Sequence, residues 1–282
     1  MFTCTDQTNE VVTLNSHPAK RIISLVPSQT ELLHYLGLED EVVGITKFCV
    51  YPRLWFEHKK RVGGTKSIHM DAIGELNPDL IIGNKEENIR TEVEELRKMA
   101  PVWVSDIATL PDALEMIQQV GLLVGKQQEA LTLVGQIEQR FKKLAEITGD
   151  NCKLNQLTNT AAKRVAYLIW HEPYMAVGRD TFIGDMLRRC GFENIFENES
   201  RYPMVNLQQL ESLQCEYLLL SSEPFPFKET HAEEIRQQLP NVKVVFVDGE
   251  MFSWYGSRLL MATQYFKELK ESMNGDLAPR LS

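Results

Sequence analysis

The sequence has no run of about 18 consecutive apolar residues, the length that a membrane-spanning helix needs. Its longest basic run is Lys59–Arg61, and the formal net charge is -9. A nucleic-acid groove requires many Lys and Arg side chains facing phosphates. Neither a transmembrane helix nor a nucleic-acid partner is therefore expected.

Cysteines are scarce and scattered: there are five, an odd number, and none forms a C-x-x-C pair. This disfavours a disulfide framework and a cysteine zinc site, and free thiols fit a reducing compartment. The first residues, MFTCTDQTNEVVTL, lack the basic and apolar regions of a secretory signal. The sequence as written predicts a cytoplasmic protein. A chain without its leader would look the same, so a periplasmic or surface-anchored location stays open.

Catalytic motifs are also missing, because no nucleophile and base stand at a motif spacing and no P-loop or dinucleotide fingerprint occurs. We therefore expect a binding protein rather than an enzyme, with no catalytic residue and no intrinsic cofactor. The length of 282 residues suits two domains. We expect a monomer.

Two stretches of the chain follow one pattern: Met70–Glu87, MDAIGELNPDLIIGNKEE, and Leu207–Pro224, LQQLESLQCEYLLLSSEP. In each, a short amphipathic helix leads through an acidic residue, Asp79 or Glu216, into an apolar strand. Each position of the second stretch lies 137 residues after its counterpart. This duplication predicts two similar α/β lobes with a ligand between them.

Apolar strands alternate with helical patterns in both halves, which is typical of mostly parallel sheets. The helical segments Thr30–Gly37 and Thr181–Gly191 both close with glycine. Ser28, with Glu31 three residues later, forms a capping box that predicts the start of the first helix. Open parallel sheets bind ligands at their carboxyl edge, so we expect a site there.

Apolar residues recur at spacings of three, four and seven between Val124 and Ile147. They predict one helix over 124–148, about 40 Å long, that ends at Gly149. Its position favours a strut between the lobes over the alternative, an ordinary crossover helix with a long exit loop. The expected domains are 1–123, the helix 124–148, and 149–282, and a rigid link predicts only small closure.

Four motifs, in this order, resemble a known family: RIISLVPSQTELLHYLGL, LNPDLIIG, AVGRDTFIGDMLRRCGFENIF and MFSWYGSR. The family is the helical-backbone metal-receptor group, or class III solute-binding proteins of ABC importers, which includes vitamin B12 and ferric-siderophore binders. The GRDTFIGDMLRRCG and SWYGSR blocks look most like cobalamin-binding members. The resemblance covers nearly the whole chain. It implies two Rossmann-like lobes joined by a long helix, capture of a corrinoid, haem or ferric chelate between them, and delivery to an ABC permease.

The resemblance also implies roles for single residues. Tyr51 matches a tyrosine of the ligand-facing loop in vitamin B12 binders, and Tyr202 lies near a ligand-stacking tryptophan of the second lobe. Two further family tryptophans are replaced here by Thr65 and Asn84. Half of the aromatic clamp of the family is therefore missing.

Permease docking in this family uses an acidic residue on the rim of each lobe. The matching positions are Asp71 and Gln208, which are again 137 residues apart. Only Asp71 is charged, so Glu211 is the expected substitute for the missing charge in the second lobe.

The segment WHEPY follows a strand of the second half and is rich in large side chains. Trp170 and Tyr174 offer aromatic faces that suit a flat macrocycle. His171 can ligate a metal axially, as imidazole commonly does. The alternative, which we favour for a single histidine, is a solvated or hydrogen-bonded loop residue.

A second aromatic segment, DGEMFSWYGSR, lies between a strand and a helix. Phe252, Trp254 and Tyr255 are expected to contact the ligand, and Arg258 to pair with a carboxylate or phosphate. The alternative is that two of the aromatics belong to the core between the lobes. We expect at least one of Trp254 and Tyr255 to face the cleft.

Carboxylates follow both repeated strands: Glu86 and Glu87 in the first half and Glu223 in the second. Such a rim can hold a hard cation or the amide edge of a corrin ring. Glu87 can equally cap the next helix.

Cys49 is expected in a loop at the same edge, where a buried and unreactive thiol is favoured over a nucleophile.

The sequence thus predicts a solute-binding protein for a cobalamin-like corrinoid or a related chelate. One alternative is a cytoplasmic enzyme or cofactor-handling protein on the same fold, with Cys49 and the cleft carboxylates in its site. A receptor for a bare metal ion is a weaker possibility, since only His171 and Glu172 approach a ligand cluster.

Overall fold

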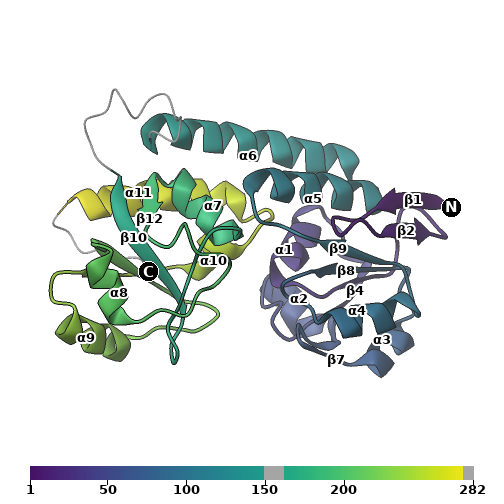
Figure 1. Ribbon diagram of the computed structural model, residues 1–282. Helices are drawn as coiled ribbons and strands as arrows, with labels where there is room; N and C mark the ends of the chain where they lie inside the picture. Colours follow the sequence, from purple (N-terminus) through teal and green to yellow (C-terminus); the bar gives the residue numbers. More distant parts are fainter. Residues whose placement is uncertain (149–161, 276–282) are drawn as a thin grey trace. The chain divides into compact units, whose positions relative to one another are not determined.

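The computed structural model describes residues 1–148 and 162–275, which form two compact units (Figure 1). Unit 1 comprises Met1–Ile107, Pro111–Gln136 and Trp254–Arg258, and unit 2 comprises Ala108–Leu110, Ile137–Ser253 and Leu259–Ser282. One boundary between the two units, between Gln136 and Ile137, lies inside α6 (Gln127–Thr148).

Unit 1 is built on a parallel five-stranded sheet with the order β5-β4-β3-β8-β9. Its strands are β3 (Ile22–Ser24), β4 (Val42–Ile45), β5 (Lys60–Arg61), β8 (Leu80–Asn84) and β9 (Val102–Ser105). The helices of this half are α1 (Pro27–Tyr35), α2 (Arg53–His58), α3 (Met70–Leu76), α4 (Arg90–Arg97) and α5 (Leu110–Leu123). Two small antiparallel hairpins add β1 (Phe2–Thr5), β2 (Val11–Leu14), β6 (Gly63–Gly64) and β7 (Ser67–Ile68).

Unit 2 has a mostly parallel sheet in which β10 pairs with β12 and β13, β13 pairs with β14, and only β11 runs antiparallel. The strands are β10 (Lys163–Trp170), β11 (Met175–Ala176), β12 (Phe192–Asn194), β13 (Tyr217–Ser221) and β14 (Lys243–Val247). The helices are α7 (Phe182–Arg189), α8 (Leu207–Ser212), α9 (Glu229–Gln238), α10 (Gly249–Ser253) and α11 (Leu259–Asn274).

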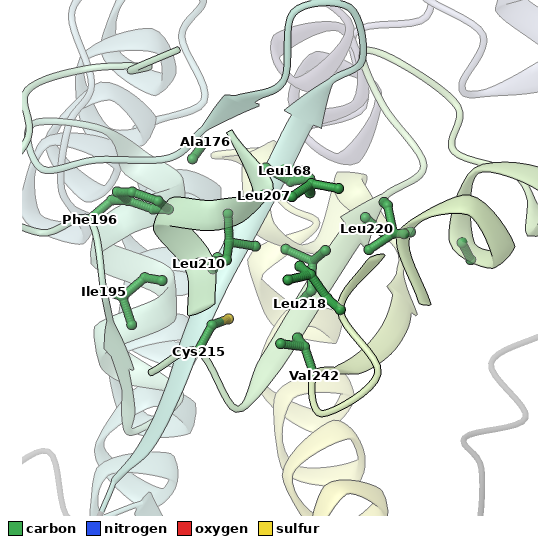
Figure 2. Close-up of a cluster of buried hydrophobic side chains, with 14 of the residues drawn as sticks. Leu168, Ala176, Ile195, Phe196, Leu207, Leu210, Cys215, Leu218, Leu220 and Val242 are labelled. Carbon is green, nitrogen blue, oxygen red and sulfur yellow. The ribbon is translucent and has the colours of Figure 1, made fainter. Parts of the chain in front are cut away.

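The two faces of the unit 2 sheet carry separate layers of core, because successive side chains of a strand point to opposite faces. On one face Leu168 packs with Leu210 of α8 and Leu218 of β13 (Figure 2). On the other face the Tyr167 ring meets Phe252 of α10 at 5.2 Å between centroids. Burial of each such side chain stabilises the fold by about 1.5–3 kcal/mol. The sheet is therefore fixed from both sides.

The predicted duplication is visible at the level of single hydrogen bonds. Asp79 accepts the backbone N–H of Arg21 at 2.8 Å, and Glu216 accepts that of Arg164 at 2.8 Å. Each arginine side chain also donates to a carbonyl at the end of the helix before the acidic residue, at 2.6 Å and 3.0 Å. The acidic residue at the start of one strand thus anchors the start of its neighbour in both units.

The predicted capping box at Ser28 is wrong. The first helix, α1, begins at Pro27 with Val26 as its N-cap, and no side chain caps it. Proline fits the first helical position because its φ is fixed and its missing N–H would have no intrahelical partner there. Glu31 is consequently available for another role.

The predicted helix over 124–148 begins later than expected. α5 ends at Leu123. Gly125 then turns the chain with a left-handed φ of +70°, and α6 starts at Gln127. The 22 residues of α6 span about 33 Å at the standard rise. The predicted end at Gly149 lies outside the described residues. The domain boundaries at 123/124 and 148/149 stay predictions.

No helix within residues 1–148 and 162–275 is long and apolar enough to cross a membrane.

Candidate functional site

An exposed apolar segment follows β4 at the carboxyl edge of the unit 1 sheet. Phe48, Val50 and Tyr51 expose 51%, 40% and 43% of their surface. The Lys47 amine lies 5.1 Å from the centre of the Phe48 ring. Adjacent exposed apolar side chains of this size are typical of contact surfaces. We call these three residues the unit 1 edge surface; Tyr51 was expected, whereas Phe48 and Val50 were missed.

Arg258 does not present its charge to a ligand as expected. Its guanidinium donates to Glu31 through Nε at 3.1 Å and Nη2 at 2.7 Å, and only 7% of the residue is exposed. The cation also lies over the rings of Tyr51, at 5.0 Å, and Trp254, at 4.7 Å. The predicted pairing with a ligand anion gains no support from this structure, since a carboxylate of the protein occupies the fork.

The aromatic residues of the FSWY segment are buried. Phe252 has no exposed surface, and its ring packs against Tyr167 and Phe266 in the unit 2 core. The expected ligand contact by Phe252 is therefore wrong, because core packing covers the ring. Trp254 and Tyr255 are buried as well, and whether either contacts a ligand stays a prediction.

The loop after β8 is held by amides. Asn84 Oδ1 accepts the backbone N–H groups of Glu86, at 2.8 Å, and Glu87, at 3.1 Å. Asn88 Oδ1 accepts the N–H of Asn84 at 2.9 Å. Ile89 is the N-cap of α4 and its side chain makes no capping hydrogen bond, so the alternative that Glu87 caps this helix stays a prediction. Both glutamates are partly exposed and stay candidates for a rim.

Cys49 is fully buried, and the Thr30 hydroxyl donates to its sulfur at 3.1 Å. Thr46 Oγ1 also lies 3.1 Å from the sulfur. Burial raises the pKa of the Cys49 thiol. The hydrogen bonds with Thr30 and Thr46 lower the pKa by less than burial raises it, so the pKa stays above its usual value. The thiol therefore stays protonated and enclosed, and it lacks the features of a nucleophile.

A second aromatic surface lies at the carboxyl edge of unit 2. Trp170, the last residue of β10, is 41% exposed, and its ring meets Phe225 at 5.8 Å. His171 stacks on Phe225 with ring centres 5.5 Å apart and meets Tyr174 edge-on at 5.1 Å. We call these four residues the unit 2 edge surface. Phe225 was missed, although the FPF sequence after β13 signalled it.

His231 lies beside this surface, with its ring centre 4.9 Å from that of His171. Its Nδ1 accepts the backbone N–H of Lys228 at 2.9 Å, which completes the first turn of α9. In the neutral ring the proton then sits on Nε2, so His231 has no free lone pair for a metal. No group of three or more His, Cys, Asp or Glu side chains suited to a metal ion occurs in the described parts of the chain. The bare-metal alternative gains no support.

Three other predicted ligand-site residues belong to unit 2. The Glu223 carboxylate accepts the Ser253 hydroxyl at 2.5 Å. Glu172 is exposed next to His171. The Tyr202 ring lies under the Arg201 guanidinium at 5.8 Å, in the segment between β12 and α8.

The three residues expected to dock a permease are all exposed. Asp71 lies in the first turn of α3, and Gln208 and Glu211 lie on α8. Gln208 also lines a cavity of about 330 Å³ with Glu172 and Tyr174.

The GRDTFIGD motif lines a cavity of about 410 Å³ in unit 2. Asp185 lines it and accepts the Leu110 N–H at 2.8 Å and the Arg189 side chain at 2.7 Å. Burial by itself would raise the pKa of Asp185, but hydrogen bonds from Arg189 and Arg188 outweigh burial and lower it. The charged carboxylate thus fastens Leu110 to α7.

Comparisons with known proteins agree on one family. The family model described as periplasmic binding protein matches residues 22–243. A vitamin B12-binding protein of Vibrio parahaemolyticus is 29% identical over 213 residues, which are 74% of each chain. An uncharacterized ABC transporter substrate-binding lipoprotein of Bacillus subtilis is 24% identical over 97% of this chain and 86% of its own. The fold of a periplasmic haem-binding protein of Pseudomonas aeruginosa superposes with a TM-score of 0.75 at 18% identity, over 94% of this chain and 95% of that one.

These matches confirm the predicted fold class, two α/β lobes of the class III type with mostly parallel sheets. They also support a binding protein rather than an enzyme. The names of the relatives give no support to the predicted cytoplasmic location. Because the family model spans most of the sequence, the chain belongs to the periplasmic binding protein family, as a class III solute-binding protein.

Proposed function

We propose that the protein binds a corrinoid, or a related metal chelate such as haem or a ferric siderophore, as the substrate-binding component of an ABC importer. The observation that carries this proposal is the pair of exposed aromatic surfaces at the carboxyl edges of the two sheets. Their most exposed aromatic members are Phe48 and Tyr51 in unit 1 and Trp170 in unit 2. The names of relatives, which include vitamin B12-binding and haem-binding proteins, support the ligand class.

Aromatic surfaces suit such a ligand for a physical reason. A corrin or porphyrin ring is a flat apolar body, and aromatic rings give it a large contact area while they lose little conformational entropy. The carboxyl edge of a parallel sheet is also where open α/β folds bind ligands. Both features occur in each unit separately.

His171 is the proposed axial ligand of the chelated metal. Its ring is held by Phe225 and Tyr174 and, unlike His231, it shows no hydrogen bond to the backbone in the described structure. An imidazole oriented in this way can replace a weakly bound water on cobalt or iron. Addition of aquocobalamin should then shift the visible spectrum for the wild type and leave it unshifted for His171→Ala.

We also propose that the protein delivers its ligand to an ABC permease. Asp71 and Glu211 are exposed carboxylates that suit basic sockets, and Gln208 supplies a neutral contact beside Glu211. The names of the relatives support a periplasmic or surface-anchored location over a cytoplasmic one. Fractionation of cells that express the natural gene tests the location, and light scattering tests the expected monomer.

The binding test is calorimetric titration of the purified protein with cyanocobalamin, hemin and a ferric hydroxamate. Tyr51→Ala and Trp170→Ala should each weaken binding about tenfold, because each removes one aromatic contact. Tyr35→Ala is the matched control. Tyr35 is 45% exposed but ends α1, which returns from the carboxyl edge to the opposite edge of the sheet, so its loss should not change affinity. Absence of binding for all three ligands at about 100 μM would refute the proposal.

A further inference from the structure

Glu31, Arg258 and Tyr51 form a chain of contacts that ends at the unit 1 edge surface. All three belong to unit 1. The carboxylate holds the guanidinium with two hydrogen bonds, and the guanidinium lies 5.0 Å from the centre of the exposed Tyr51 ring. The chain thus links a carboxylate on α1 to an exposed aromatic ring.

The two hydrogen bonds to Glu31 fix the orientation of the Arg258 guanidinium as well as neutralising its charge. Two parallel hydrogen bonds to one carboxylate set the plane of the group as well as its position. Trp254 contacts the same cation at 4.7 Å, and its ring meets Tyr51 edge-on at 6.0 Å. The Tyr51 ring is thus held from its inner side by a buried cation and a buried indole, while 43% of the residue is exposed.

The segment that carries Arg258 is also closely packed. A Cβ atom added at Gly256 would lie 2.9 Å from the carbonyl oxygen of Ser28 and 3.4 Å from Leu32 Cβ. The chain from Trp254 to Arg258 therefore lies directly on α1, the helix that carries Glu31. The position of the guanidinium is set by the fold and not by a ligand.

Two cations of this edge are paired with carboxylates of the protein. Arg258 is matched by Glu31, and Lys85 is matched by Asp106 at 2.5 Å. Lys47 is exposed beside Phe48. Glu86 and Glu87 add negative charge in the loop after β8. An anionic ligand would thus find Arg258 and Lys85 already paired with carboxylates of the protein, and the exposed Lys47 as a further cation beside Phe48.

We propose that Glu31 and Arg258 are positioning residues for Tyr51, and that they make the site select overall neutral or cationic corrinoids over dianionic haem. The inference rests on the proposed function and deepens it. A corrin ring carries amide side chains and needs no cation from the protein, whereas the two propionates of haem need cationic partners, and Glu31 already holds Arg258. The same pairing that orients Tyr51 thus withholds one cation from the haem propionates.

Three variants test this with cyanocobalamin and hemin as probes in calorimetric titrations of the full chain. Glu31→Gln keeps the shape but removes the negative charge, so Tyr51 loses its fixed support and Arg258 gains a free fork. Cyanocobalamin should bind about three- to tenfold more weakly and hemin more tightly, which shifts the affinity ratio about tenfold or more toward hemin. Arg258→Met should weaken cyanocobalamin binding without any gain for hemin. Glu31→Asp keeps the charge but breaks the two-point geometry, and should weaken only cyanocobalamin binding.

Glu57→Gln, which removes the exposed ion pair with Arg53 on α2, is the control and should leave both affinities unchanged. Melting curves of each variant identify loss of folding, and Glu31→Asp provides the comparison if Arg258→Met unfolds. A wild type that binds hemin more tightly than cyanocobalamin, or an unchanged affinity ratio in Glu31→Gln, would overturn the inference alone. A wild type that binds no chelate would overturn the proposed function itself.

Discussion

Substitution of Gly178 by alanine is expected to destabilise unit 2 strongly. Gly178 opens the GRDTFIGD motif, and its N–H donates to the carbonyl of Arg201 at 2.8 Å. The next residue, Arg179, donates to the carbonyl of Glu199 at 2.8 Å. A Cβ atom at position 178 would lie 2.4 Å from the Glu199 oxygen and 3.1 Å from the Arg201 oxygen. Both obstacles are backbone atoms, so no side-chain rotation can relieve the clash.

The magnitude follows from the movement required. The two segments would have to separate by roughly 1 Å to reach an ordinary contact distance, which overpacking data put at about 1–3 kcal/mol. The movement would weaken both backbone hydrogen bonds, each with a net contribution of about 1 kcal/mol. The lower entropy of the unfolded alanine chain returns about 0.4–1 kcal/mol. We expect a net loss of about 2–3 kcal/mol in the free energy of unfolding.

Urea denaturation followed by circular dichroism measures this loss. Gly135→Ala is the control, because Gly135 lies inside α6 with no atom within 4 Å of an added Cβ. Alanine there should stabilise the protein by about 0.5–1 kcal/mol, since glycine is a poor helix former. A Gly178→Ala variant that unfolds at the same urea concentration as the wild type would contradict the argument that the two backbones are in direct contact.

Two further predictions concern buried polar groups. Asp185→Asn should destabilise the protein most at neutral pH, because the pKa of Asp185 is lowered on folding and its charged form therefore stabilises the fold above the unfolded pKa, near 3.8. The difference in the free energy of unfolding between wild type and variant should shrink as the pH falls below about 4. A difference that stays the same between pH 7 and 3 would contradict this. Cys49→Ala should lower stability by about 1–2 kcal/mol through lost packing while ligand affinity stays unchanged, and the native thiol should resist a thiol reagent until the protein unfolds. Loss of function in Cys49→Ala without loss of stability would favour the enzyme alternative.

The repeated pattern could be predicted because it depends on local features that recur at a fixed offset. An acidic residue between an amphipathic helix and an apolar strand is visible in the sequence at Asp79 and Glu216. The structure shows why it recurs: in each unit the carboxylate receives a backbone N–H at the start of the neighbouring strand. The glycines that close the two helices were predictable for the same reason, since Gly37 and Gly191 both adopt positive φ, +75° and +73°.

The candidate site was harder to predict because its residues are defined by distant partners. Glu31 and Arg258 are 227 residues apart in sequence. Arg258 alone reads as a free cation next to aromatics, and only the fold reveals that Glu31 occupies it. Phe252 was mistaken for a ligand contact for the same reason, because its covering residues come from β10 and α11. Exposure of Phe48 and Val50 likewise depends on how the loop after β4 turns.

The structure shows what holds the two positions at which the resemblance predicts tryptophans. Thr65 and Asn84 are both buried. Asn84 Nδ2 donates to Ser105 Oγ at 3.0 Å, and Asn88 Nδ2 donates to the Thr65 carbonyl at 3.0 Å. These positions are therefore parts of a polar network and not vacant places in an aromatic clamp.

Replacement of Asn84 by the tryptophan that the resemblance predicts should consequently not improve corrinoid binding. Asn84→Trp would remove the amide that orders the loop after β8 and would force an indole into a space closed by Ser105. We expect a loss of about 2–4 kcal/mol in the free energy of unfolding and weaker, not tighter, corrinoid binding. Urea denaturation and calorimetric titration measure the two effects. If the variant kept its stability and bound cyanocobalamin more tightly, the network would be a dispensable replacement for the clamp, and the unit 1 edge surface would not be the principal contact of this unit.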